Sequence, residues 1–149
     1  MIRDIYLKKL VIDIMNARKY KILIADDDTD YLFQLKYYLE KAGFEIITAE
    51  SQREAEKIIS EIKPDLAILD LMMESDDSGF ILSYKIKKLY PDIPVIISTA
   101  VASETGITFG LSAEEDKRWI KADLYLEKGI RTEQLLTEIH KLLNINGNS

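Results

Sequence analysis

The chain has 149 residues, 47% of them hydrophobic and 31% charged, which is enough for one folded domain with a sizeable core and too few for two ordinary ones. Acidic residues outnumber basic ones by 26 to 20, and this balance argues against broad nucleic-acid binding, which needs a basic face. The lack of cysteine excludes disulfides, thiolate nucleophiles and cysteine-ligated metals. Charges interrupt the first twenty residues and no apolar run approaches membrane-spanning length, so we expect a cytoplasmic protein without a signal peptide.

Residues 1–19 come first, and their apolar residues recur at near-helical spacing, which predicts an extra N-terminal helix. Short apolar strands and amphipathic helices then alternate. The predicted strands are Tyr20–Ala25, Phe44–Ala49, Asp65–Met72, Val95–Thr99 and Asp123–Glu127. The predicted helices are Asp30–Lys41 with Gly43 as its stop, a helix capped by Ser51 and ended by Pro64, about Gly79–Leu89, and Thr132–Leu143. The connection Ala100–Ala122 is too long for a simple crossover, and we expect irregular structure there with a short helix near Ala113–Ile120.

The alternation of strands and helices predicts right-handed parallel crossovers and therefore an α/β fold with a doubly wound parallel sheet. In such sheets the chemistry lies at the carboxyl ends of the strands. The candidates for a site are therefore the residues just past the strands, namely Asp26–Asp28, Asp70, Thr99 and Lys128.

The stretch KILIADDDTD places four carboxylates directly after the first predicted strand, and Asp70 ends the third. These two strands are neighbours in the expected sheet, so Asp26, Asp27 and Asp70 should converge. Two such charges about 4 Å apart repel by roughly 4 kcal/mol at an effective dielectric of about 20. A cation, a raised pKa or a greater distance must offset this repulsion. A hard divalent cation with oxygen ligands, most simply Mg2+, suits the arrangement.

A carboxylate beside Mg2+ can also attack a phosphoryl group, which gives an aspartyl phosphate. The transferred group then needs a metal, a cation and a hydroxyl around it, and Lys128 and Thr99 can supply the last two. Each residue also has a plain structural interpretation. The Asp triplet can be a helix N-cap with solvated neighbours, Asp70 the start of a turn, and Thr99 and Lys128 ordinary surface residues. The joint pattern favours a site, because each residue lies at the end of a different strand of one sheet.

The pieces ILIADDD, PDLAILDLMM, PVIISTA and ADLYLEK resemble, in order and close to its spacing, a known family. The sequence resembles a single-domain, CheY-like receiver domain of the bacterial response regulators, over about Tyr20 to Leu143. The resemblance implies a flavodoxin-like sheet of five parallel strands in the order 2-1-3-4-5, here with an extra N-terminal helix and an enlarged fourth βα connection. It divides the chain into a helical extension 1–19, a receiver domain 20–145 and a frayed tail 146–149.

The resemblance implies a phosphoacceptor and a metal site. Asp70 would accept the phosphoryl group from the phosphohistidine of a partner kinase. Asp27 and Asp70 would bind Mg2+ directly, with the backbone carbonyl of Met72 as a third protein ligand, and Asp26 would act through water. Asp28 falls outside the usual acidic pair and is expected to cap the following helix.

The resemblance also implies a switch. Thr99 would turn its hydroxyl toward one phosphoryl oxygen, and Lys128 would pair with another. Tyr125 looks like the family's switch aromatic, which turns inward when Thr99 moves. A half-buried strand tyrosine is the alternative interpretation of Tyr125.

Three departures from the family pattern bear on these roles. Lys128 is followed by Gly129, where the family usually has a proline in a cis bond, so a rigid positioning device is missing. Met73 is followed by Glu74, where the family usually has proline. The connection from Thr99 to Lys128 is longer than usual, and it covers the surface by which receivers signal.

The implied function is that of a phosphoacceptor signalling domain in a two-component phosphorelay, with no enzymatic activity beyond its own phosphorylation and dephosphorylation. Phosphorylation would shift a partner surface made of the fourth helix, the fifth strand and the last helix of the family fold. The expected partners are a sensor histidine kinase or phosphotransfer protein and a downstream protein, with no output domain, nucleic acid or membrane. A homodimer through the N-terminal helix or through that surface is a further expectation. Met72 and Val101 are apolar and cannot orient an attacking water, so we expect slow loss of the phosphoryl group.

Two alternatives stay open at this point. The first is a Mg2+-dependent phosphohydrolase with an aspartyl nucleophile after the first strand, for which Asp26 and Asp28 have the required spacing. The second is a pseudo-receiver, a binding module that keeps the fold without phosphorylation. The missing proline after Lys128 and the rebuilt signalling face support the second alternative.

Overall fold

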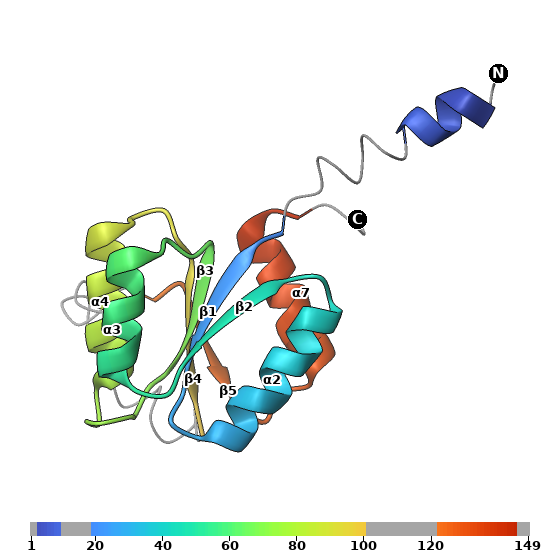
Figure 1. The fold of residues 1–149 in the computed structure, drawn as a ribbon. Helices are drawn as coiled ribbons and strands as arrows, with labels where there is room; N and C mark the ends of the chain where they lie inside the picture. Colours follow the sequence, from blue (N-terminus) through green and yellow to red (C-terminus); the bar gives the residue numbers. More distant parts are fainter. Residues whose placement is uncertain (1–2, 10–18, 101–121, 146–149) are drawn as a thin grey trace.

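A computed structural model describes residues 3–9, 19–100 and 122–145 of the chain. The elements in chain order are β1 (Lys21–Ala25), α2 (Thr29–Lys41), β2 (Glu45–Ala49), α3 (Gln52–Glu61), β3 (Leu66–Asp70), α4 (Ser78–Leu89), β4 (Val95–Thr99), β5 (Leu124–Glu127) and α7 (Thr132–Leu143) (Figure 1). Residues 3–9 are also helical, as predicted. The rest of the N-terminal extension, the short helix expected near Ala113–Ile120 and the tail 146–149 lie outside the described residues.

The five strands form one parallel sheet in the order β2-β1-β3-β4-β5, which confirms the predicted fold class. Successive side chains of a strand point to opposite faces, so each buried strand feeds two cores. Leu23 and Ala25 of β1 belong to the core under α3 and α4, whereas Ile22 and Ile24 belong to the core under α2 and α7. Figure 1 shows these two helix pairs on opposite faces of the sheet.

The helix boundaries follow from local chemistry. Asp28 is the N-cap of α2, because its side chain accepts a hydrogen bond from the Tyr31 backbone N–H. Gly43 has a φ of 101°, a conformation that L side chains rarely adopt, and it turns the chain from α2 into β2. Ser51 caps α3 through the backbone N–H of Glu54. The predicted caps of both helices and the Gly43 stop of α2 are therefore confirmed, and α3 ends at Glu61, three residues before Pro64.

The third strand is shorter than predicted. It ends at Asp70 rather than at Met72. Leu71 still donates a hydrogen bond to the Ser98 carbonyl at 2.9 Å, but its own carbonyl accepts from the backbone N–H of Gly79 at 2.8 Å. The chain therefore leaves the sheet directly after Asp70 and enters the loop before α4.

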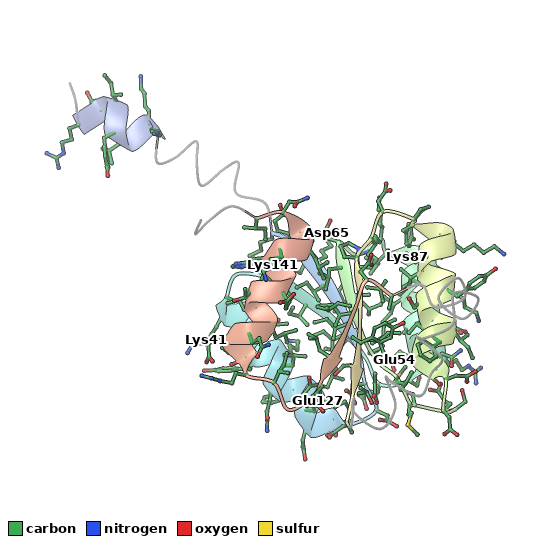
Figure 2. All side chains as sticks on the ribbon, turned by 180° about the vertical axis from the view of Figure 1, so that it is seen from behind. Lys41, Glu54, Asp65, Lys87, Glu127 and Lys141 are labelled. Atoms are coloured by element: carbon green, nitrogen blue, oxygen red, sulfur yellow. The ribbon has the colours of Figure 1, made fainter. Side chains whose placement is uncertain are left out.

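The parallel arrangement brings the carboxyl ends of all five strands to one edge of the sheet. Figure 2 shows Glu127, the last residue of β5, at this edge and Asp65, which precedes β3, at the opposite one. In the described part of the chain, no helix combines the length and the apolar character that a membrane span requires.

Candidate functional site

Three carboxylates meet at the carboxyl edge of the sheet. Asp26 directly follows β1, and its backbone N–H donates to the Ala49 carbonyl at 3.0 Å, so it is held like a strand residue. Asp70 is the last residue of the neighbouring β3. Asp26 and Asp70 are only 1% and 6% exposed, whereas Asp27 is exposed. One carboxylate oxygen from each of Asp26, Asp27 and Asp70 lies within 4.8 Å of the others. The predicted convergence of the three side chains is thus observed.

The fourth acid of the cluster has a different task. The Asp28 side chain caps α2, and its backbone N–H donates to Oδ1 of Asp26 at 2.8 Å. This bond occupies Oδ1 of Asp26, while Oδ2 of the same carboxylate pairs with Lys128. Asp28, the third of the consecutive acids, therefore starts α2 by its side-chain cap.

Lys128 brings positive charge to the carboxylates. It follows β5, and its Nζ lies 2.8 Å from Oδ2 of Asp26 and 3.5 Å from Oδ1 of Asp70. Burial lowers the pKa of Lys128, but the hydrogen bond and charge of Asp26 and the charge of Asp70 outweigh it, so the net pKa is raised. The side chain therefore stays a cation and bridges the two buried acids.

The lysine does not fully neutralise the cluster. Burial raises the pKa of Asp70 to about 7, and the charges of Asp26 and Asp27 act in the same direction, while Lys128 opposes them. Three carboxylates with one ammonium leave uncompensated negative charge among hard oxygen donors. Such a donor set suits a divalent cation such as Mg2+.

Thr99 and Tyr125 lie beside this cluster. Thr99 ends β4 and is buried, and its carbonyl accepts a hydrogen bond from the Lys128 backbone N–H at 2.9 Å. Tyr125 of β5 packs edge-on against Phe80 of α4, with ring centroids 6.3 Å apart. Its hydroxyl is buried and has no hydrogen-bond partner in the structure described here, and burial raises the pKa of Tyr125 to about 12.

The loop after Asp70 is tied to the N-terminus of a neighbouring helix. The Glu74 carboxylate accepts hydrogen bonds from the backbone N–H groups of Gln52 and Arg53, at 2.7 and 3.0 Å. Desolvation raises the pKa of Glu74, but these two bonds outweigh it and hold the pKa below its usual value. Met72, whose carbonyl the sequence nominates as a ligand, lies in this loop with its side chain exposed.

Three residues around the site were not foreseen from the sequence. The Tyr31 ring lies 5.0 Å from Nζ of Lys128, and Tyr31 and Ser98 of β4 line one cavity beside the lysine. Glu74 caps a helix that is distant in sequence. The signal for Tyr31 was its place, one helical turn after the acids; the other two residues carry no local signal.

Comparison with known proteins agrees with the geometry. The family model described as the response regulator receiver domain matches residues 22–140. The chain belongs to this family. Receiver domains are phosphoacceptor signalling domains of two-component systems and are generally not enzymes, and they bind Mg2+ at an acidic cluster.

Curated relatives are longer than this chain. The phosphate regulon transcriptional regulatory protein PhoB of Pseudomonas aeruginosa is 33% identical over 128 residues, which are 85% of this chain and 52% of that protein. The transcriptional regulatory protein PrrA of Mycobacterium tuberculosis is 31% identical over 116 residues, 78% of this chain and 49% of that protein. The chain thus spans about half the length of these relatives.

Solved structures share the whole fold. A CheY-like receiver domain protein from Methanospirillum hungatei has a TM-score of 0.71 at 28% identity, covering 85% of this chain and 95% of that one. The response regulator TrrA of Thermotoga maritima, solved in complex with Mg(2+)-BeF, has a TM-score of 0.68 at 28% identity, covering 83% of this chain and 98% of that one.

Proposed function

We propose that this receiver domain takes up a phosphoryl group on Asp70 and passes on a signal through a changed protein surface. The observation that carries the proposal is the meeting of three carboxylates and one lysine, with Lys128 at 2.8 Å from Asp26 and 3.5 Å from Asp70. An oxygen of the Asp70 carboxylate attacks phosphorus, the bond to the donor's phosphohistidine nitrogen breaks, and the leaving imidazole keeps the electron pair.

Asp26, Asp27 and Asp70 are the residues that would hold Mg2+, Asp26 through water, with the Met72 carbonyl as a further ligand. When bound, the ion supplies the positive charge that the carboxylates and the transferred oxygens lack. Burial is the main cause of the raised pKa of Asp70, and the charges of Asp26 and Asp27 add to it more than Lys128 removes, which supports a role for a further cation at this place.

Lys128 and Thr99 are proposed to bind the transferred group. Lys128 lies within reach of Asp70, so a short movement of its ammonium group from Asp26 would bring it to a phosphoryl oxygen. Thr99 is the last residue of β4, the strand next to β3, and would offer its hydroxyl to another oxygen. These two contacts would pull the ends of β4 and β5 toward the new charge.

Tyr125 is proposed to report this movement to the surface. It lies on β5 between Thr99's strand and the outside, with its ring packed on Phe80. Among the described residues its buried hydroxyl has no partner, which is costly, and this cost favours an outward position in which the hydroxyl meets water. A contact that Thr99 gains or loses can therefore shift the ring.

The domain division is proposed as residues 20–145 for the receiver unit, with 1–19 as an extension and 146–149 as a tail. The exposed side chains of Ile5, Tyr6 and Leu7 support a docking or dimer role for the extension. A sensor histidine kinase or phosphotransfer protein is the proposed donor, and a downstream protein the proposed receiver of the signal.

Intact-mass measurement after incubation with acetyl phosphate tests the proposal. With Mg2+, the wild type should gain the mass of one phosphoryl group, and with a chelator it should not. Asp70→Asn should gain nothing, whereas the control Asp76→Asn, which alters an exposed acid of the neighbouring loop, should behave as the wild type.

Two results would contradict the proposal. A folded wild type that gains no mass would be a pseudo-receiver, and a protein that hydrolyses a phosphate ester with Asp70 replaced would be a phosphohydrolase. Titration of the wild type and of Asp70→Asn with Mg2+ measures binding of the ion. It distinguishes a site that binds Mg2+ but is not phosphorylated from a site that neither binds Mg2+ nor is phosphorylated.

A further inference from the structure

Little of the backbone fixes the side chain of Lys128. Its backbone N–H is bonded to Thr99, but the next residue is Gly129, and a Cβ at Gly129 would meet no atom of the described residues within 4 Å. These residues therefore place little steric constraint on the chain directly after the lysine. A long, flexible side chain in such a position loses much rotamer freedom when it is held at one point.

The packing beside Lys128 is open as well. A cavity of about 250 Å³ lies between the helix pair α2 and α7 and the sheet. Its lining includes Tyr31, Leu35, Ser98, Lys128, Ile130 and Leu135. On this side the lysine stem borders empty space rather than close-packed side chains, so packing does not decide where the ammonium group points.

Ion pairs with Asp26 and Asp70 hold the ammonium group from one side, and the Tyr31 ring adds a second constraint. Nζ of Lys128 lies 5.0 Å from the ring centroid, within the range of about 6 Å at which an aromatic face attracts a cation. Two features place the ring. The Tyr31 backbone N–H donates to Oδ1 of Asp28 at 3.1 Å at the start of α2, and the side chain lines the cavity together with the buried Ser98 of β4.

We propose that Tyr31 is the positioning residue for Lys128, holding the ammonium group on its ring face between Asp26 and Asp70. The inference rests on the proposed function for its consequence, since Lys128 is the cation that would meet the phosphoryl group. Tyr31 does not touch the reacting atoms in this arrangement and acts through the lysine alone. A residue in the first turn of α2 thereby helps to place the ammonium group of Lys128, which the backbone of the turn after β5 does not fix.

Nuclear magnetic resonance of the resting protein tests the geometry without any phosphorylation. Protons above an aromatic face resonate upfield, so the ε-methylene protons of Lys128 should be shifted upfield in the wild type. Tyr31→Phe keeps the ring and should keep the shift, whereas Tyr31→Leu should abolish it and make the side chain more mobile. An unchanged Lys128 signal in Tyr31→Leu would overturn the proposal.

The same helix offers a matched control. Tyr37 is 59% exposed, and Nζ of Lys41 lies 5.4 Å from its ring centroid, so Tyr37→Leu also removes a lysine–tyrosine pair from α2. This variant should leave the Lys128 signal and the phosphorylation rate unchanged. A loss equal to that of Tyr31→Leu would mean that α2 as a whole, and not the ring at residue 31, supports the site.

A double-mutant cycle tests the consequence for the chemistry. With acetyl phosphate and Mg2+, Tyr31→Leu should slow phosphorylation of Asp70 by about threefold to tenfold, and Tyr31→Phe by less than about twofold. In a Lys128→Ala background, Tyr31→Leu should have less than about a twofold further effect, because the residue acts through the lysine. Equal losses in both backgrounds would show a general structural role and overturn the proposal.

The experiments distinguish failure of the proposed function from failure of the positioning role. If the wild type takes up no phosphoryl group, the proposed function is wrong, and the resonance of Lys128 still decides whether Tyr31 holds it. If the wild type is phosphorylated and the Lys128 resonance does not depend on Tyr31, the proposed function stands and the positioning role is wrong.

Discussion

The loop after Asp70 and the turn that carries Lys128 are held in place by different means. The first loop is bound by its own backbone, by the Glu74 cap on α3 and by Gly79, whose missing side chain lets α4 lie directly on the backbone of Asp70. In the described part of the chain no atom lies within 4 Å of a side chain added at Gly129, and the ammonium group of Lys128 is placed by its contacts with Asp26 and Tyr31. The proposed nucleophile is thus fixed by close backbone packing, and the proposed cation by charge and an aromatic ring.

The largest expected effect contrasts the glycines of the two loops. A Cβ at residue 79 would lie 2.7 Å from the Asp70 carbonyl oxygen and 2.8 Å from Leu71 Cα, and both are backbone atoms. Gly79→Ala should therefore lower the free energy of unfolding by about 3 kcal/mol. Gly129→Ala should change it by no more than about 0.5 kcal/mol. Urea unfolding of both variants measures the difference, and equal values would show that the first loop yields as easily as the second.

The next effect concerns the negative charge of Asp70, which Lys128 does not fully offset. The pKa of Asp70 is raised to about 7, so between about pH 4 and pH 7 the folded protein keeps a proton that the unfolded chain has released. Stability from this group therefore falls as the pH rises through that window. Asp70→Asn carries no charge and should be more stable than the wild type by about 2 kcal/mol at about pH 8 without Mg2+.

Conditions and a control sharpen this test. The advantage of Asp70→Asn should shrink at about pH 5, and it should shrink at about pH 8 when Mg2+ is added, because bound Mg2+ stabilises the ionised wild type. Asp76→Asn, an exposed acid nearby, should show neither trend. An advantage that is independent of pH would assign the effect to packing rather than to charge.

The family resemblance implied the strand order, and the meeting of Asp26, Asp70 and Lys128 could be predicted with it, because each residue lies at the end of an apolar run. The carboxyl ends of parallel strands share one edge, so topology alone brings such residues together. The capping role of Asp28 also followed from its position before an amphipathic run. These are all properties of local pattern plus sheet order.

The contacts of Tyr31 and Glu74 could not be predicted in the same way. Tyr31 looks like any half-buried residue of an amphipathic helix, and its task depends on where the Lys128 side chain points. Glu74 lies 22 positions from Gln52, and its cap depends on the path of a loop relative to another helix. The sequence raised doubt about Lys128 because of Gly129, but it held no sign of what replaces the missing constraint.

A smaller effect probes the tie between the first loop and α3. Glu74→Gln keeps the shape but leaves only one acceptor oxygen for the two N–H donors, so it should lower the free energy of unfolding by about 0.5–1 kcal/mol. Because the pKa of Glu74 is lowered in the folded protein, this contribution is present above the unfolded pKa and is lost as the pH falls through the folded value. Chemical unfolding of Glu74→Gln and of the control Asp76→Asn, from the same loop, measures the difference in the free energy of unfolding. Equal effects of the two variants would show that the cap contributes nothing specific.

The smallest effect concerns hydrolysis of the phosphorylated Asp70. It tests whether the loop after Asp70 lacks a group that orients the attacking water. Met72 lies two residues after Asp70 with its side chain exposed, and it has no polar atom that could orient water strongly. Met72→Asn adds an amide at this place and should speed the loss of the phosphoryl group by about threefold, whereas Met72→Leu should leave the rate unchanged. The decay of the phosphorylated mass after removal of acetyl phosphate follows both variants. If Met72→Leu and Met72→Asn decay alike, water reaches Asp70 by a route that the first loop does not control, and the open side of the Lys128 turn becomes the place to look for it.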